Sequence, residues 1–304
     1  MTLIDVITLF DTDEKCREML VRLRWPNGPE CPRCKMSVIE LETERQLFYC
    51  KSCDYQFTVT AGTIFNDSHL PLKIWFLAAL LLCEAKKGMS AHQLKRTIWG
   101  LHKGSYKTAW YLCHRIRAAM AMAVKDRPML DGTVEMDETY VGGKARGYGQ
   151  GWRGERHPKQ IVIGIRQRNG DLRFFHAEDA KSGTLQKYIA ENVSTDVDVI
   201  VTDELPAYKS AVGDAEHKTV NHTAKEYVRY ESGECISTNT VESAFSLLKR
   251  GIVGSWHKIS AKHLQRYLDE ITFRFDRRNN PDLFIDTLRH MVTADPLTFA
   301  KLTA

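Results

Sequence analysis

The sequence predicts a multidomain α+β protein with a small cysteine-rich ribbon, a helical middle of helix-turn-helix type, and an α/β domain with a mixed sheet. Helical periodicity runs through residues 70–126, whereas short β-rich segments alternate with helices after Pro128. Between them, KDRPMLDG combines proline, glycine and charges, which is typical of a domain boundary. We therefore expect domains at residues 1–60, 69–127 and 130–304.

Length and composition are those of a soluble globular protein. The 304 residues allow two or three domains, and the hydrophobic and charged fractions are 43% and 27%. The net charge of +5 favours a polyanionic partner only weakly. The longest apolar run, IWFLAALLLC at 74–83, is too short to span a bilayer, and the N-terminus is acidic where a signal peptide is basic. We expect a cytoplasmic protein without a membrane partner, associated with the nucleoid when it is bound to DNA.

The ribbon contains two matched cysteine pairs, which follow a short amphipathic helix over residues 1–25. CPRC at 31–34 and CKSC at 50–53 are separated by fifteen residues, and each pair can aim two thiolates at one point. A redox site would need only one such pair at a helix start. Four thiolates complete a closed tetrahedral shell, so we expect one structural Zn²⁺. Its predicted ligands are Cys31, Cys34, Cys50 and Cys53.

The helical middle has the pattern of two helices joined by a short connection. Ser90 and Ser105 are suitable caps, and Gly100 and Gly104 bracket the connection. A basic second helix after a short turn suits the major groove of DNA, although a basic solvated helix in a linker explains the same pattern. The side chains expected to contact DNA are Lys107, Tyr111, His114, Arg115 and Arg117.

Acidic residues stand out in the third zone. GTVEMDETYVGG at 132–143 alternates as a strand does, with Asp137 and Glu138 on opposite faces. QIVIGIRQR and DLRFFHAED follow, joined at an Asn-Gly hairpin signal. DVDVIVTDE is a largely apolar strand that ends at Asp203, and α/β folds place active sites at such strand ends. A short strand near HKTVNH and a helix at 238–251 complete the order.

Asp137, Asp203 and Glu242 can hold two Mg²⁺ or Mn²⁺ ions, since hard cations prefer oxygen ligands. Two such ions activate a water or a 3′-hydroxyl and stabilise the leaving oxygen of a phosphoryl displacement. Each acid also has an ordinary explanation, because Asp203 can cap a helix and Asp137 can end an edge strand. Their occurrence together favours the metal site.

The helix TNTVESAFSLLKRG at 238–251 offers two interpretations of Glu242. Asn239 and Glu242 form a capping box ahead of an apolar run. Glu242 and Lys249 also lie within about 20° on one helix face, which lets Glu242 reach a metal and Lys249 a DNA phosphate. We expect Glu242 to be the ligand and Asn239 to be the cap or to lie next to the metal site.

Two further basic segments are candidates for DNA contact. The glycine-rich loop 142–159 carries Lys144, Arg146, Trp152 and Arg153, and Trp152 can stack on a distorted base. A solvated connector is the alternative. Lys249 is followed by Arg250, which we also expect to contact DNA. Farther along, Glu270 and Arg274 have the spacing of an intrahelical ion pair.

The chain resembles the ISXO-like DDE group of insertion-sequence transposases over essentially its whole length. The resemblance is carried by CPRC and CKSC, KTAWYLCHRIR, VEMDETYVGGK, IVTDELPAYK and TNTVESAFSLLKRGIVGSWHKISAKHLQRYLDEITFRF, in the family's order. It implies an N-terminal zinc ribbon, a helical DNA-binding segment and an RNase H-like catalytic domain. By this likeness the three catalytic acids are Asp137, Asp203 and Glu242, with Lys249 as the basic residue. Some relatives emphasise an asparagine in this helix, which keeps Asn239 as an alternative.

The resemblance implies a polynucleotidyl transferase that binds insertion-sequence ends. It would cleave DNA and transfer strands by hydroxyl attack on phosphodiesters. The partners would be double-stranded DNA, as terminal inverted repeats and as target, and a second copy of the chain, because two ends are joined. A non-catalytic regulator and an RNase H-like nuclease are the competing hypotheses.

Overall fold

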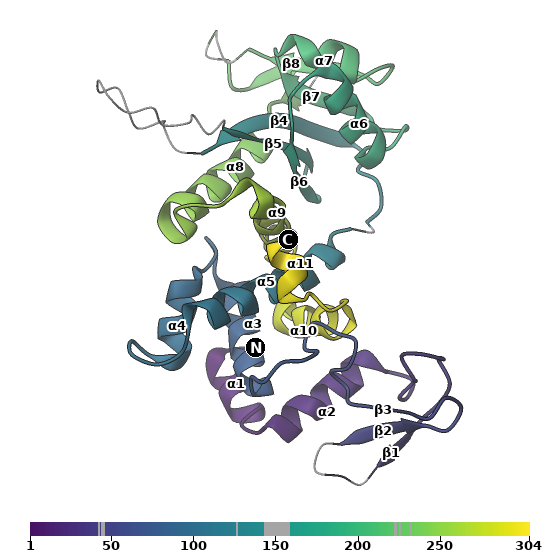
Figure 1. Cartoon of the computed structure of the whole chain (residues 1–304). Coiled ribbons are helices and arrows are strands. Elements are labelled where there is room, and N and C mark those ends of the chain that lie inside the picture. Colours follow the sequence, from purple (N-terminus) through teal and green to yellow (C-terminus); the bar gives the residue numbers. More distant parts are fainter. Residues whose placement is uncertain are drawn as a thin grey trace. The chain divides into compact units, whose positions relative to one another are not determined.

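The computed structural model describes the whole chain except residues 42, 44, 45, 126, 143–158, 222, 223, 225 and 232. The chain divides into two compact units (Figure 1). Unit 1 comprises Met1–Asp126 and Arg277–Ala304, and unit 2 comprises Arg127–Asp276. No helix among the described residues is both long and apolar enough to cross a membrane.

The N-terminal part of unit 1 consists of α1 (Leu3–Leu9), α2 (Asp13–Arg24) and a three-stranded antiparallel ribbon of β1 (Ile39–Leu41), β2 (Leu47–Cys50) and β3 (Tyr55–Phe57). The hydroxyls of Thr2 and Thr12 cap α1 and α2. The ribbon buries Phe48 and Phe57, whose rings make edge-to-face contacts with the Trp25 ring. So small an apolar core needs a further source of stability, such as a bound metal.

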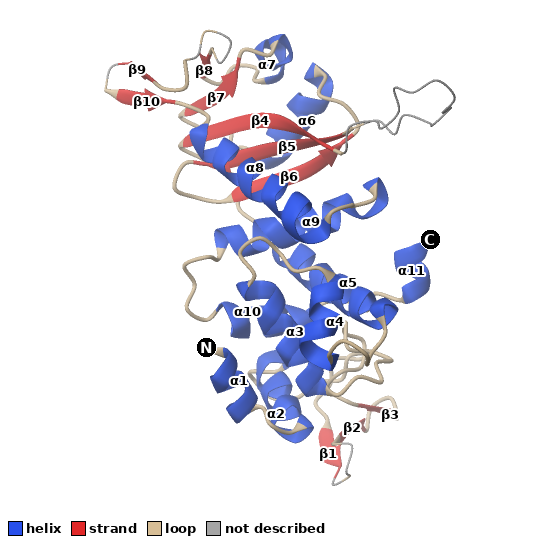
Figure 2. Ribbon diagram, turned by 90° about the vertical axis from the view of Figure 1, so that its left-hand side faces the viewer, coloured by secondary structure: helices blue, strands red, loops and turns tan. Residues whose placement is uncertain are grey.

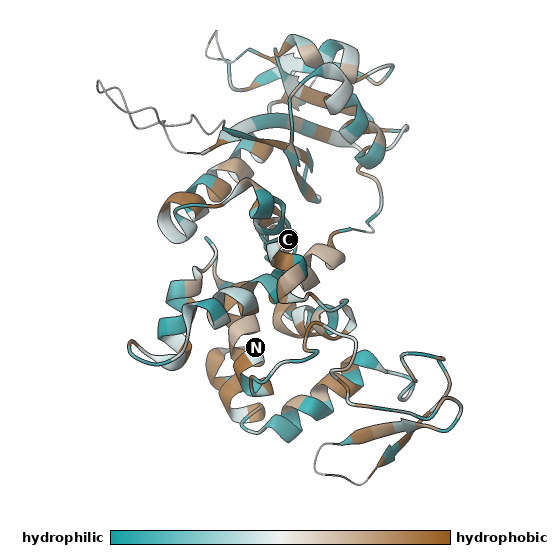
Figure 3. Ribbon diagram, in the orientation of Figure 1, coloured by the Kyte–Doolittle hydropathy of each residue, from teal (hydrophilic) through white to brown (hydrophobic). Residues whose placement is uncertain are grey.

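The helical part of unit 1 is built around α5 (Tyr106–Ala123), on which α3 (Leu72–Glu84), α4 (Ala91–Trp99) and α10 (Leu283–Thr293) pack. The Ser90 hydroxyl caps α4 by accepting a hydrogen bond from the Gln93 amide at 3.1 Å, as expected. Ser105 is the N-cap residue of α5, but its side chain makes no capping hydrogen bond. Both helices begin where the sequence pattern predicts, and Figure 3 shows the polar residues of α4 as hydrophilic segments.

The last helices belong to unit 1, although we expected residues 277–304 to lie in the catalytic domain. The Phe284 ring of α10 lies 6.3 Å from that of Phe10 and 6.0 Å from that of Phe76. The short helix α11 (Phe299–Thr303) follows. The expected assignment of these residues is corrected by this packing, since α10 buries its apolar face on α2, α3 and α5. The other expected domain ranges stay predictions.

Unit 2 contains a five-stranded mixed sheet in the order β6-β5-β4-β7-β8 (Figure 2). The strands β4 (Thr133–Val141), β5 (Gln160–Gln167) and β6 (Leu172–Ala177) are antiparallel neighbours. The strands β7 (Val199–Asp203) and β8 (His217–Val220) continue the sheet in parallel with β4. This is the RNase H-like topology, so the expected fold class is confirmed. The Asn-Gly turn joins β5 to β6 as predicted, with Asn169 at a φ of 63°.

Helices cover both faces of this sheet. On one face, α6 (Ser182–Asn192) and α7 (Pro206–Ala211) pack on a core that contains Met136, Ile163 and Ile165. On the other face, α8 (Asn239–Gly251), a π-helical turn (Ile252–Trp256) and α9 (Ala261–Asp276) pack on Val162 and Phe174. A hairpin of β9 (Arg229–Glu231) and β10 (Glu234–Ile236) precedes α8. Within α9, Glu270 and Arg274 form the predicted ion pair at 3.1 Å.

Candidate active site and metal centre

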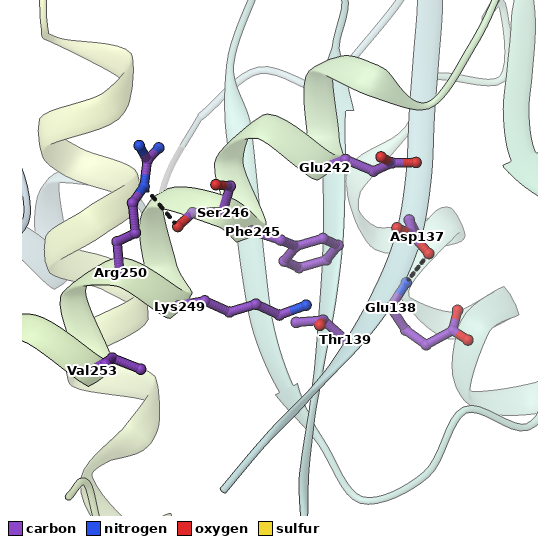
Figure 4. Close-up of a pocket in the computed structure, with 9 residues that line it drawn as sticks. All are labelled: Asp137, Glu138, Thr139, Glu242, Phe245, Ser246, Lys249, Arg250 and Val253. Atoms are coloured by element: carbon purple, nitrogen blue, oxygen red, sulfur yellow. Dashed lines mark hydrogen bonds between the residues drawn. The ribbon is translucent and has the colours of Figure 1, made fainter. Parts of the chain in front are cut away.

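Three elements of unit 2 bring the predicted catalytic residues together. Asp137 lies on β4, Asp203 ends β7, and Glu242 lies in the first turn of α8. Because β4 and β7 run parallel, both carboxylates lie toward the carboxyl ends of these two strands. A cavity of about 580 Å³ opens there (Figure 4). Its walls include Asp137, Glu138, Thr139, Glu242, Phe245, Ser246, Lys249, Arg250 and Val253.

The carboxyl of Asp137 has a strongly perturbed acidity. Burial and the charge of Glu138 raise the pKa of Asp137 to about 7. The charges of Asp203 and Glu242 act in the same direction, whereas a hydrogen bond from the Glu138 amide, at 2.8 Å, opposes the shift. The mutual influence shows that four carboxyl groups share one region. Such a region gains from a divalent cation, which neutralises the accumulated negative charge.

Glu138 and Tyr208 take part in this region, although sequence reasoning did not single them out. Tyr208, on α7, is fully buried and donates a hydrogen bond from its hydroxyl to Glu138 Oε2 at 2.9 Å. Burial raises the pKa of Glu138, and it raises that of Tyr208 well above the usual value. Strand alternation in the sequence could have identified Glu138, because it puts this acid on the same face as the apolar Val134 and Met136.

The start of α8 is held by Glu135 of β4, which is fully buried. Its Oε2 accepts hydrogen bonds from the Thr240 amide at 2.8 Å, the Thr240 hydroxyl at 2.6 Å and the Val241 amide at 3.1 Å. Its Oε1 forms an ion pair with Arg168 at 3.0 Å. A carboxylate at a helix N-terminus is favourable because it accepts from unpaired amides and complements the helix dipole.

The predicted capping role of Asn239 is therefore wrong. The N-cap residue is Thr238, and Asn239 is an exposed residue at the first helical position. The Thr238 hydroxyl donates to Glu242 Oε1 at 2.9 Å, so the expected capping box is replaced by a different contact. Glu242 lines the cavity and Asn239 does not. This arrangement favours Glu242 over Asn239 as the third residue of the metal site.

Lys249 and Arg250 line the same cavity from two turns farther along α8. Figure 4 shows the Lys249 side chain extending across the cavity toward Thr139. The Arg250 side chain turns back, and its Nε donates to the Ser246 carbonyl at 3.1 Å. Both side chains are exposed, so the predicted cations do lie beside the carboxylates.

The ribbon brings together the four cysteine sulfurs. Their Sγ atoms all lie within 4.8 Å of one another, with Cys34 and Cys50 at 3.4 Å and Cys31 and Cys53 at 3.7 Å. Among the residues that the structure describes, this is the one set of metal-ligand atoms gathered so closely. Four converging thiols have the chemistry and spacing of a closed zinc shell, which supports zinc binding at this centre.

The expected DNA contacts of α5 are largely wrong. His114, Arg115 and Arg117 are buried, with exposed fractions of 0%, 4% and 1%. The Arg115 guanidinium donates to the Asn66 carbonyl at 2.6 Å, and the His114 ring packs against Trp110. The reason is that α5 is the central helix of unit 1, so its polar side chains are enclosed.

The remaining predicted DNA-contacting residues fall into two groups. Lys107, in the first turn of α5, is exposed and lies over the Phe299 ring, whereas the half-buried Tyr111 donates its hydroxyl to the Leu297 carbonyl. The loop candidates lie outside the described residues, and their roles stay predictions. They are Lys144, Arg146, Trp152 and Arg153.

Two protein-family profiles match this chain. One, described as an ISXO2-like transposase domain, matches residues 129–276, which is nearly the whole of unit 2. The other, described as a transposase zinc-ribbon domain, matches residues 11–56 and includes all four clustered cysteines. Both agree with the resemblance that the sequence motifs indicate.

A curated relative covers most of the chain. It is an uncharacterized protein in transposable element ISH50 of Halobacterium salinarum, 28% identical over 290 residues, which span 88% of this chain and 92% of that protein. The Mos1 strand transfer complex is 10% identical, with a TM-score of 0.29 over 71% of this chain and 74% of its own. The strand transfer complex of the Drosophila P element transposase is 12% identical, with a TM-score of 0.27 over 76% and 61%. Scores this low establish neither fold nor function.

Proposed function

We propose that this chain, which transposase-family profiles match over residues 11–56 and 129–276, is a transposase of the ISXO2-like family and an active enzyme that cleaves and joins DNA at insertion-sequence ends. The observation that carries the proposal is one cavity that combines Asp137 and Glu242 with Lys249, beside the strand end at Asp203. Acids and a cation arranged in this way suit a reaction at a phosphodiester, which is itself an anion.

Asp137, Asp203 and Glu242 would hold two divalent cations, Mg²⁺ or Mn²⁺. Bound there, the cations would activate the attacking hydroxyl and stabilise the leaving oxygen. The chain's own residues supply the positioning. Lys249 lies where it can bind the phosphate next to the acids, and Glu135 fixes the helix that carries both Glu242 and Lys249.

The other partners follow from the same proposal. One structural Zn²⁺ would complete the fold of the ribbon through Cys31, Cys34, Cys50 and Cys53. The nucleic-acid partner would be double-stranded DNA, first as the terminal inverted repeats and then as the target. Since two ends must be joined, we infer a homodimer or larger assembly on DNA.

The test uses purified full-length protein with Mg²⁺ or Mn²⁺ and DNA that carries the element's own terminal inverted repeats. Asp137→Ala, Asp203→Ala and Glu242→Ala should each abolish nicking and joining, while zinc content and DNA binding remain. The matched control is Asp214→Ala, at an exposed acid on the segment between α7 and β8. Full activity in any of the three variants would contradict the assignment. An RNA–DNA hybrid tested in parallel separates a transposase from an RNase H-like nuclease.

A further experiment decides whether Glu242 or Asn239 is the third residue of the metal site. Glu242→Gln should lower cleavage by about a thousandfold, since a lost metal ligand removes several kcal/mol of transition-state stabilisation. Asn239→Ala should stay close to the unchanged protein, because Asn239 is exposed and does not line the cavity. Equal losses in the two variants would restore Asn239 as a site residue.

A further inference from the structure

We propose that α4 and the connection to α5 form a surface that binds the phosphate backbone of double-stranded DNA through Arg96, Lys103 and Lys107. This inference rests on the proposed function, which makes DNA the partner. Of the α5 residues that the sequence pattern predicted, it keeps only Lys107, and it adds Arg96 of α4 and Lys103 of the connection.

The excess of positive charge in the chain is concentrated around these two helices. Residues 85–125 hold nine of the 43 Lys and Arg residues and none of the 38 Asp and Glu residues. Without this segment the chain would carry a net negative charge. Arg115 and Arg117 are buried, so a polyanion that binds this segment must contact its other cations.

Arg96, Lys103 and Lys107 are all exposed. Among the residues that the structure describes, none of the three forms an ion pair with a carboxylate. Lys107 keeps its ammonium group over the Phe299 ring, 4.4 Å from its centroid, which still leaves hydrogen-bond donors for an anion. Exposed cations without carboxylate partners attract the closely spaced charges of a nucleic-acid duplex.

The connection between α4 and α5 is held in one conformation. Gly100 and Gly104 have φ values of 83° and 72°, which favour glycine. A Cβ at Gly104 would lie only 2.9 Å from Trp99 Cβ, so the connection folds back tightly over Trp99. In addition, the Lys95 ammonium group donates to the Leu101 carbonyl at 3.0 Å. Lys103 therefore lies on a short, constrained turn.

A ring stack joins the starts of the two helices. The rings of His92 and Tyr106 stack with their centroids 4.3 Å apart at 26°. Arg96 lies one turn after His92 on the same face of α4, and Lys107 follows Tyr106. The three cations thus lie on two helices that pack together and on the connection between them. Contacts from such a surface to phosphates position a protein on DNA without reading its sequence.

The test compares two triple variants of the full-length protein. Arg96→Gln, Lys103→Gln and Lys107→Gln are combined in one, and Arg22→Gln, Lys181→Gln and Lys187→Gln, at exposed positions elsewhere, in the control. Affinity is measured against salt on a terminal-repeat duplex and on a duplex of unrelated sequence. The slope of log K against log salt should fall by about 2.7 for the first variant, since each lost phosphate contact removes about 0.9. It should fall equally on both duplexes and stay unchanged in the control.

Different failures have different meanings. If the unchanged protein binds no duplex DNA, the proposed function itself is wrong. If it binds DNA but the first variant keeps the full slope, or the control loses as much, the surface assignment is wrong and the proposed function stands. Zinc content and thermal unfolding check that each variant is folded. If the triple variant unfolds, the single variant Arg96→Gln replaces it, with an expected fall in the slope of about 0.9.

Discussion

At the scale of single residues, the active-site carboxylates are supported by a buried phenol. Tyr208 donates its hydroxyl to Glu138, and its pKa responds to Asp137 and Asp203 as well. The hydroxyl therefore lies near three acids at once. By holding Glu138, it fixes the carboxyl whose charge raises the pKa of Asp137 the most.

Tyr208→Phe removes this donor while keeping the ring. It should lower the free energy of unfolding by about 1–3 kcal/mol, because a half-buried carboxyl loses its hydrogen bond. Metal-dependent cleavage should fall as well, since Glu138 is no longer fixed. Urea unfolding and cleavage assays measure the two effects. Tyr188→Phe is the control, because the Tyr188 ring stacks on Phe175 away from the acids. Equal effects of the two substitutions would contradict a role for the Tyr208–Glu138 bond.

The raised pKa of Asp137 predicts how stability depends on pH. The folded state keeps the proton up to about pH 7, whereas the unfolded chain releases it near the usual value of 3.8. In metal-free protein this group therefore stabilises the fold fully below the unfolded value, and the contribution is lost as pH rises toward and through about 7. Denaturant unfolding between pH 5 and pH 8 should show the loss.

Asp137→Asn is the matched variant, because the amide does not titrate. Its stability should change less over the same pH range. In the unchanged protein, Mn²⁺ should bind more tightly as pH rises, since the ion needs the ionised carboxylate. The same pH profile for both proteins would show that Asp137 has an ordinary pKa.

At the scale of elements, the position of α8 depends on one side chain from a neighbouring strand. Glu135 accepts three hydrogen bonds from the first turn of α8 and pairs with Arg168. Because α8 carries Glu242 and Lys249, a shift of this helix would displace both from Asp137.

Glu135→Ala should lower the free energy of unfolding by about 3 kcal/mol, because it leaves buried amides and the Arg168 charge without their acceptor. Glu135→Gln keeps an acceptor and should cost less. Urea unfolding measures both, and cleavage activity should follow the order of the two losses. An alanine variant as stable as the unchanged protein would show that α8 is held by its apolar face alone.

The elements also show what the sequence can and cannot predict. Alternation along β4 and an apolar strand ending at Asp203 are local patterns, so the acids could be located without a structure. Helical spacing is likewise visible in the sequence at Leu112 and Ile116 of α5, which lie four residues apart and are buried. It could not show that α10, distant in sequence, packs on the same helix and helps to enclose its polar side chains. The partners of Glu135 and Glu138 depend on non-local contacts in the same way.

At the scale of the whole molecule, the chain leaves unit 1, forms unit 2 and then returns. Residues 277–304 supply Phe284, Leu288, Met291 and Val292 to the core of unit 1, all of them buried. Each such side chain contributes about 1.5–3 kcal/mol on burial, which together rivals the stability of an entire domain.

Deletion of residues 277–304 should therefore unfold unit 1 and leave unit 2 folded. Limited proteolysis is expected to digest residues 1–126 while residues 127–276 resist. Leu288→Ala is the milder comparison, with an expected loss of about 2–5 kcal/mol in unit 1 alone. Continued protection of residues 1–126 in the truncated protein would show that α10 is dispensable for the unit.

The return of the chain also sets an order of events during synthesis. A ribosome releases residues 127–276 before it releases α10, so the later-starting unit is the first whose residues are all available. Until then, the nascent N-terminal helices lack the partner that covers α5. The first helices therefore keep apolar surface exposed during most of translation, until the last helices are synthesised. We expect chaperones to bind the nascent chain mainly during this interval.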